Sequence, residues 1–448
     1  MSRSLGRCLI TVVFAGLGAG AVQAADTEAY VNAPMPPGFT VQASEIEGPV
    51  YADEKGRTLY RWPVRSLRNG DVGERRGAAP SCDNDKYTVS SGMMSPYPPG
   101  LELPDLDTRP ACAEMWPPVL APADAKAVGD WSIVRRKNGA KQWAYEGYPL
   151  YLSVLDRAPG DVIGGTRRPP AYDGAPARDP IGPAANVPAE FGVVNVATGR
   201  MLVNLDGKSV YAWDRDPPNK SVCHDACARE WQPVLAPASG KSQGEWSVVD
   251  RAAGVKQWAF RGKPLYTYTG DRKPRSLEGS DVPGWRNVYT QAAPKPPAEF
   301  TYQDSRAGVV LADKTGRTIY VYYCGDDALD QLPCDHPETS QAYRLAICGG
   351  GDPERCNRTF PYVVAAANAK SENRSWTVMA IDPKTGKRAA DGEARALRVW
   401  AYRDRPVYTF YRDRKPGDIW GDSWGEMHGR RNGFKAFWIR DDFMNGAG

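Results

Sequence analysis

The chain repeats itself three times, and this repetition limits its possible folds more than any other sequence feature. Three runs recur in the same order in each copy. The three copies of the first run lie at residues 53–60, 206–211 and 313–320. Those of the second lie at 112–120, 227–235 and 356–364, and those of the third at 141–151, 256–266 and 398–408. Tandem copies of this kind predict homologous structural units placed one after another along the chain.

The starts of the copies agree as well, since Phe39, Phe191 and Phe300 each follow a proline a few residues before. A length of 448 residues also suits about three domains. We therefore expect three units and refer to them as units 1, 2 and 3. The predicted organisation is unit 1 at residues 39–164 with an inserted loop at about 63–111, a Pro-rich linker at 165–187, unit 2 at 188–291, a short linker at 292–297 and unit 3 at 298–448.

The composition favours β-structure. The chain holds 45 Gly and 39 Pro, typical of many turns, together with 14 Trp and 22 Tyr, which favour strands. Gly-containing turns lie between runs of Val, Tyr, Trp and Thr around Gly56 and again around Gly147. The sequence predicts an all-β protein, in which each unit is a doubled β-hairpin with short antiparallel strands.

The N-terminal residues predict export. Residues 1–24 read as a signal peptide, with Arg3 and Arg7 before an apolar stretch and small residues before the cleavage point after Ala24. Cys8 precedes the apolar stretch, where no lipid can be attached, and we find no later stretch long enough to cross a membrane. We expect a soluble periplasmic or secreted protein, and the formal charge of +4 gives no reason to expect nucleic acid.

Eight cysteines remain after the signal peptide, and an even number in an oxidising compartment indicates disulfides. Aligning the repeats makes Cys112, Cys227 and Cys356 equivalent. The predicted pairs are Cys82–Cys112, Cys223–Cys227, Cys348–Cys356 and, in unit 3 alone, Cys324–Cys334. A metal site at residues 223–227 is the competing interpretation, but His224 has no counterpart in the other copies. No Cys-x-x-Cys occurs, which excludes c-type haem attachment and thioredoxin-like chemistry.

The strand after each turn ends in Tyr-x-aromatic, and an Asp often follows three residues later. Complete Tyr-x-[Phe/Trp/Tyr]-x-x-Asp motifs stand at 211–216, 266–271 and 408–413. With the Cys-x-x-x-Cys and Gln-Trp…Gly-x-Pro-Leu-Tyr runs, they resemble a family of secreted repeats of bacterial envelope proteins and lipoproteins. The chain departs from that motif at Tyr60, Tyr151 and Tyr320. The resemblance implies the architecture and an envelope location, but no activity, because the family has no established one.

The motif side chains are the candidate binding residues. They are Tyr211, Trp213, Asp216, Tyr266, Tyr268, Asp271, Tyr408, Phe410 and Asp413. Two rings separated by one residue share a face of the sheet and could stack on a sugar or another flat ligand. Core packing is the alternative, because each unit must fill its interior and the rings recur at matching positions.

Other candidate sites have simpler explanations. Solvated loops account for two acidic clusters that could otherwise bind a divalent cation, namely Asp83, Asp85, Asp105 and Asp107, and Asp326, Asp327, Asp330, Asp335 and His336. Residues 421–425 match Gly-x-Ser-x-Gly around Ser423, with His428 nearby, but a nucleophile elbow needs an α/β sheet.

No residue set reaches the level of an active site, and the sequence favours, without deciding, a non-enzymatic protein. We expect a binding or scaffolding protein that contacts an envelope protein or glycan and needs no cofactor. A metal-binding protein is the alternative, and a hydrolase the third hypothesis.

Overall fold

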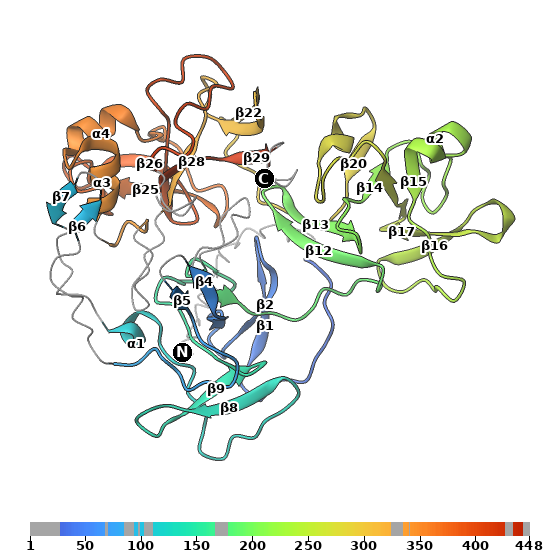
Figure 1. Cartoon of the computed structure of the whole chain (residues 1–448), viewed down its shortest axis with the longest axis horizontal. Coiled ribbons are helices and arrows are strands. Elements are labelled where there is room, and N and C mark those ends of the chain that lie inside the picture. The colour runs from blue at the N-terminus through green and yellow to red at the C-terminus, as the bar shows by residue number, and fades with distance from the viewer. Residues whose placement is uncertain are drawn as a thin grey trace, which may run out of the picture.

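The structure is a computed structural model that describes residues 27–67, 70–84, 94–96, 99–102, 111–165, 178–323, 335–339, 341–425 and 433–441. The predicted signal peptide and the predicted Cys324–Cys334 bond lie outside the described residues. The described chain is mostly β, with few and short helices (Figure 1). Its named strands pair antiparallel in small sheets, which confirms the predicted all-β class of short antiparallel strands.

Unit 2 shows the repeat in its simplest form, as three small sheets. The first contains β12 (Phe191–Val196), β13 (Gly199–Asn204) and β21 (Tyr289–Ala292). The second contains β15 (Trp231–Pro233), β19 (Tyr266–Tyr268), β14 (Tyr211–Trp213) and β20 (Trp285–Asn287). The third contains β16 (Trp246–Asp250), β17 (Lys256–Phe260) and β18 (Lys263–Pro264). Helix α2 (Asp225–Glu230) and the 3-10 turns η2 (Ala252–Gly254) and η3 (Glu278–Asp281) connect them.

Units 1 and 3 follow the same order with additions. Unit 3 contains β22 (Thr301–Ser305), β23 (Gly308–Ala312), β24 (Tyr320–Tyr323), α3 (Ala342–Gly349), α4 (Pro353–Thr359), β25 (Trp376–Ile381), β26 (Leu397–Tyr402), β27 (Arg405–Tyr408), β28 (Gly433–Ala436) and β29 (Trp438–Asp441). Unit 1 contains β1 (Thr40–Ser44), β2 (Gly48–Ala52), β3 (Tyr60–Arg61), β4 (Arg65–Leu67), β5 (Gly70–Val72), β6 (Met94–Pro96), β7 (Pro99–Glu102), α1 (Cys112–Met115), β8 (Trp131–Arg135), β9 (Lys141–Tyr145) and β10 (Tyr148–Pro149).

One short strand comes from the segment that composition predicts to be a linker. Strand β11 (Asp179–Pro180) pairs with β3, as β20 pairs with β14 and β28 with β24. Ile181, next to it, is buried in the core of unit 1. The last part of residues 165–187 therefore packs against unit 1.

A two-residue turn recurs before the motif strand of each unit. It contains Glu146–Gly147 in unit 1 and Arg261–Gly262 in unit 2, all with positive φ, as a type I′ hairpin requires. In unit 3 the same turn is Arg403–Asp404, with φ of 49° and 64°. An aspartate in place of glycine is strained at this position, so other contacts must hold it there.

Those contacts join unit 3 to unit 1. The Asp404 carboxylate lies 3.0 Å from the Arg157 guanidinium of unit 1 and 2.8 Å from that of Arg388. Nearby, the Glu45 carboxylate accepts hydrogen bonds from the backbone N–H groups of Arg374 and Ser375 at 3.0 and 2.9 Å. Polar contacts of this kind fix the two units against each other.

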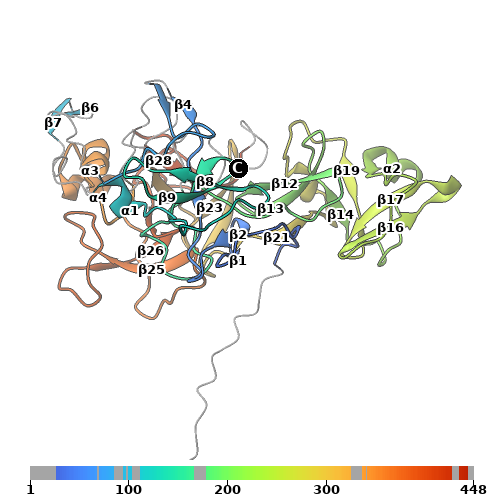
Figure 2. The same ribbon diagram turned by 90° about the horizontal axis from the view of Figure 1, so that it is seen from below.

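Unit 2 meets unit 1 through the segment that precedes the first repeat. The buried Glu28 carboxylate accepts hydrogen bonds from Nε and Nη2 of Arg200, each at 2.7 Å. The Gln291 amide donates to the Ser44 carbonyl at 2.7 Å. The far sheets of unit 2, with α2 and β14–β20, project away from units 1 and 3 in both views (Figures 1 and 2).

Candidate functional site

The motif Tyr and Asp side chains exchange hydrogen bonds between the two halves of unit 2. The Tyr211 hydroxyl donates to the Asp271 carboxylate at 2.9 Å, and the Tyr266 hydroxyl donates to Asp216 at 2.6 Å. Each motif thus supplies a tyrosine to the carboxylate of the other. Both tyrosine side chains are fully buried, and burial raises the pKa of Asp271 to about 6.

Units 1 and 3 keep the hydrogen bond from the first tyrosine to the second aspartate and replace the one from the second tyrosine to the first aspartate. Tyr60 donates to Asp156 at 2.7 Å and Tyr320 to Asp413 at 2.6 Å. Asp156 stands five residues after Tyr151, the spacing of the motif, although the second ring is lost there. Burial raises the pKa of Asp156 to about 7 and that of Asp413 to about 6.

The missing partners are supplied from elsewhere. In unit 1, the Tyr151 hydroxyl donates to Glu74, which lies in the inserted loop. In unit 3, the guanidinium of the fully buried Arg344 lies 5.6 Å from the centre of the Tyr408 ring. Every motif tyrosine therefore faces a carboxylate or a guanidinium inside the unit, which stabilises the hydroxyl or the ring in the absence of water.

The second rings of the motifs belong to a column of stacked rings. In unit 2 the column runs Trp213, Trp285, Trp231 and Tyr268, with successive ring centres 5.2, 3.7 and 4.2 Å apart and rings within 21° of parallel. The two inner rings are buried, whereas Trp213 and Tyr268 at the ends are partly exposed. Gly270 packs against the Tyr268 ring, since an added Cβ would come within 2.4 Å of it.

The same column is closed in the other two units. In unit 3 it consists of Tyr322, Phe434, Phe360 and Phe410, all at most 2 % exposed. In unit 1 the Arg178 guanidinium takes the place of Trp285 and lies 4.2 Å from both the Trp62 and the Trp116 ring centres. Trp62, the counterpart of Trp213, is 3 % exposed.

Chain length between the aligned residues explains this difference. In units 1 and 3 the counterpart of Trp213 is followed by long insertions, at residues 63–81 and 323–347. They end at Cys82 and Cys348, the first cysteine of the disulfide beside each column, whereas in unit 2 only residues 214–222 precede Cys223. The described parts of the insertions include the β4–β5 hairpin and α3. Unit 2 alone therefore presents the end of its column to solvent.

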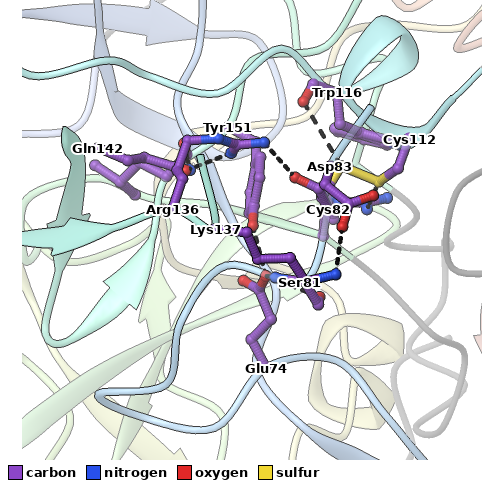
Figure 3. Close-up of a disulfide and its surroundings, with 12 residues drawn as sticks. Glu74, Ser81, Cys82, Asp83, Cys112, Trp116, Arg136, Lys137, Gln142 and Tyr151 are labelled. Carbon is purple, nitrogen blue, oxygen red and sulfur yellow. Dashed lines mark hydrogen bonds and ion pairs between the residues drawn. A yellow bond between two sulfur atoms is a disulfide. The ribbon is translucent and has the colours of Figure 1, made fainter. Parts of the chain in front are cut away.

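The disulfides join the same cysteines that the repeat alignment pairs, and lie beside the columns. They are Cys82–Cys112, Cys223–Cys227 and Cys348–Cys356, with the first drawn in Figure 3. Arg136 reaches from Gln142 to the Cys82 carbonyl with hydrogen bonds of 2.6 and 2.7 Å (Figure 3).

Unit 2 repeats this contact with Arg251, Gln257 and Cys223 at 2.7 and 2.6 Å. Unit 3 has the buried apolar pair Ile381 and Val399 at the corresponding positions.

The predicted binding residues divide by exposure. Tyr211, Tyr266, Tyr408, Phe410, Asp216 and Asp413 are all buried. Trp213, Tyr268 and Asp271 are partly exposed. Among the described residues, the predicted rings that meet solvent are thus Trp213 and Tyr268, at the two ends of the unit 2 column.

One charged side chain borders the Trp213 ring, since the Arg215 guanidinium lies 5.6 Å from its centre. Arg286 donates to Asp214 at 2.8 Å, but each of them directly follows a ring residue, so this pair faces the other side of the sheet. A flat apolar face with hydrogen-bond donors at its rim can stack on a sugar ring and bond its hydroxyl groups.

Among the described residues, no three His, Cys, Asp or Glu side chains gather as a metal site would need. Asp83 is paired with Lys137 at 2.7 Å and Asp335 with Arg405 at 2.8 Å, while the His336 ring lies 3.5 Å from Asp404. Asp85, Asp105, Asp107, Asp326, Asp327 and Asp330 lie outside the described residues.

Ser423 lies in a turn that runs into a β-bridge between Trp424 and Phe434, not in a strand-to-helix turn. Its hydroxyl accepts a hydrogen bond from the buried Lys435 at 3.1 Å, beside the partly buried Asp422. His428 is outside the described residues.

These features define an all-β, disulfide-linked protein built from tandem copies of one unit. A family described as a secreted repeat of unknown function matches residues 132–166, 192–235 and 247–286, which confirms the resemblance. No curated protein and no solved structure gives a significant match. The secreted family and the disulfides are consistent with a secreted location. Within the part of the chain that is described, no helix is long and apolar enough to cross a membrane.

Proposed function

We propose that this chain is an exported, non-enzymatic binding and scaffolding protein of the bacterial envelope, located in the periplasm, and that unit 2 contacts a glycan there. The observation that carries the proposal is the ring column, which is closed in units 1 and 3 and open at Trp213 in unit 2. The ring column stabilises all three units, but only in unit 2 does it leave the ring at its end, Trp213, accessible to solvent. An accessible ring held rigidly by its neighbours is suited to recognition.

A glycan fits this face better than a protein does. At this end of the column the accessible apolar surface is the partly exposed Trp213 ring, and the Arg215 guanidinium lies beside it. Protein interfaces instead need a wide core from which charged residues are depleted. The guanidinium N–H groups can also donate hydrogen bonds to the hydroxyl groups of a neutral sugar.

The test compares Trp213→Ala with Leu205→Ala, which removes an exposed apolar side chain of the same unit that is 76 % accessible. Purified full-length variants are sedimented with insoluble peptidoglycan and titrated with soluble neutral oligosaccharides. We expect Trp213→Ala to weaken binding about tenfold, which corresponds to about 1.4 kcal/mol for one lost stacking contact. Leu205→Ala should bind as the unmodified protein does.

Thermal unfolding of both variants checks that the fold persists. Unchanged glycan binding by a folded Trp213→Ala variant would refute the glycan site. If a photo-crosslinker placed at position 213 instead captured an envelope protein, while the glycans neither bound nor competed, unit 2 would be a protein-binding unit and the glycan assignment would be wrong.

A further inference from the structure

Unit 3 has a second exposed aromatic surface, which lies over the buried motif residues Phe410 and Asp413. We call it the unit 3 patch and define it by Arg306, Tyr411, Arg412, Trp420 and Trp424. The three rings are 47 %, 58 % and 36 % exposed for Tyr411, Trp420 and Trp424. Large rings exposed together to this extent are uncommon on a protein surface unless they bind something.

The patch is held from beneath by the interior of unit 3. The Tyr411 and Trp424 rings both lie against the buried Phe410, with centres 5.0 and 5.4 Å from its own. The Trp420 backbone N–H donates to the buried Asp413 at 3.0 Å, and the Trp424 indole N–H donates to the Ile347 carbonyl at 3.3 Å. The backbone that carries these rings is therefore fixed before any ligand arrives, which lowers the entropic cost of binding.

Each of two rings is paired with an arginine at the surface. The Arg306 guanidinium lies 5.2 Å from the centre of the Trp420 ring. The Arg412 guanidinium lies 5.4 Å from that of Tyr411, and its Nε donates to the Tyr411 hydroxyl at 2.9 Å. Cation–π contacts of this kind hold the two guanidinium groups beside the rings, and both arginines are exposed to solvent.

The fold does not require these rings, as the other copies show. Trp420 and Ile163 occupy equivalent positions, because each donates its backbone N–H to the aspartate seven residues earlier, Asp413 or Asp156. In unit 2 the residue seven positions after Asp271 is Glu278. By the same alignment, Thr269 replaces Tyr411 in unit 2. Small, aliphatic or charged side chains therefore serve at these positions, and the aromatic residues of unit 3 need another explanation.

The surroundings of the patch are positively charged. Arg414 and Lys415 are exposed in the same loop, beside Arg412. The nearby Asp418 carboxylate accepts hydrogen bonds from the backbone N–H groups of Arg414 and Lys415, at 3.0 Å each. This carboxylate therefore points toward the loop backbone. Asp304 is an exposed acid on the adjoining hairpin. Cations outnumber accessible acids on this face.

We infer that the unit 3 patch binds an anionic polysaccharide, whose sugar rings stack on Trp420, Tyr411 or Trp424 while Arg306 and Arg412 pair with its acidic groups. Guanidinium groups bind carboxylate and phosphate through two parallel hydrogen bonds, and an aromatic face binds the apolar side of a sugar ring. The site lies in a different unit from the open column end at Trp213. The inference therefore stands or falls independently of the proposed function.

The experiment measures binding of the full-length chain to three soluble polymers at 50 and 300 mM salt. Polygalacturonate offers carboxylates, poly(glycerol phosphate) offers phosphates, and dextran is neutral. Two patch variants, Arg306→Ala/Arg412→Ala and Tyr411→Ala/Trp420→Ala, are compared with Arg355→Ala/Arg358→Ala, which removes two exposed arginines of α4 in the same unit. Trp213→Ala is included to report on unit 2.

We expect at least a tenfold loss of affinity for an anionic polymer in both patch variants, a weaker affinity at the higher salt concentration, and no loss in the α4 and Trp213 variants. The carboxylate and phosphate arms tell which acidic group is preferred. Patch variants that bind as the unmodified chain does would overturn the inference. So would equal loss in the α4 variant, or a single-stranded oligonucleotide that binds the patch more tightly than either polysaccharide.

Discussion

Removing one hydroxyl from the Tyr–Asp exchange of unit 2 tests whether the family motif is structural. The Tyr266 hydroxyl donates to the Asp216 carboxylate at 2.6 Å, and Asp216 is 2 % exposed. The same carboxylate accepts the Val222 backbone N–H at 2.8 Å. The Tyr266→Phe substitution deletes the first of these bonds, together with the contact of the same hydroxyl with Ser221 Oγ at 2.8 Å, and leaves the ring packed. The coupling with Asp216→Ala in the double variant then isolates the Tyr–Asp hydrogen bond.

The expected cost follows from the groups involved. A hydrogen bond to a buried charged group contributes about 1.5–3 kcal/mol, so Tyr266→Phe should destabilise unit 2 by about 2 kcal/mol. Asp216→Ala removes the bonds to Tyr266 and Val222 and should cost about 3 kcal/mol. In the double variant the Tyr266 bond can be lost only once. The double variant should therefore cost about 2 kcal/mol less than the sum of the single variants.

A chain with three units does not unfold in one step, so the measurement must report on unit 2 alone. Hydrogen exchange read by mass spectrometry on peptides that cover β14 and β19 gives the local free energy of opening. Tyr302→Phe is the matched control, because it deletes the same atom from a side chain that is 59 % exposed. Additive costs in unit 2, or an equal effect in the control, would refute a structural role for the motif.

Three further outcomes are expected. Gln142→Val or Arg136→Ile alone should each destabilise unit 1 by about 2 kcal/mol. Both together give the apolar pair of unit 3 and should cost at least ~1 kcal/mol less than the sum, as measured by hydrogen exchange of peptides that cover β8 and β9. The pKa of Asp156 is raised from 3.8 to about 7, so its protonated form stabilises the folded state and this stabilisation is lost as the pH rises from 4 to 7. Asp156→Asn, which stays neutral, should therefore gain in melting temperature relative to the unmodified chain between pH 4 and pH 8, and a constant difference would disprove the shift. Asp404→Gly relieves a strained turn but removes the partner of Arg157, so it should loosen the contact between units 1 and 3 and speed proteolysis there at low salt.

Much of the architecture could be predicted from the repeats alone. Aligning Cys112, Cys227 and Cys356 also gave the three disulfide pairs found among the described residues. This succeeds because each copy is read against two others, so a pattern too weak to interpret in one unit becomes clear in three. Strand periodicity likewise predicted that both rings of a motif share one face of the sheet. It could not predict that the ring at the end of the column is buried in units 1 and 3 and exposed in unit 2.

The replacements inside the units could not be predicted in the same way. Glu74, Arg178 and Arg344 take the place of motif groups from positions that the alignment leaves unmatched. Their roles depend on the three-dimensional path of an insertion or of a supposed linker, which no local pattern encodes. Asp156 is the exception, since it keeps the spacing of five residues from Tyr151 and could have been found by ignoring the lost ring.

The three copies together separate what the fold needs from what it does not. Each unit needs a partner for every buried motif tyrosine and a filled column beside its disulfide, and each meets these needs with different residues. Substitutions that satisfy the same packing are neutral for the fold and carry no functional information. The informative positions are those where one copy exposes what the others bury, as at Trp213, or places a large ring where the others place small or charged groups, as at Trp420. Function in a repeat protein of this kind is therefore to be sought in the differences between its copies rather than in the motif that defines them.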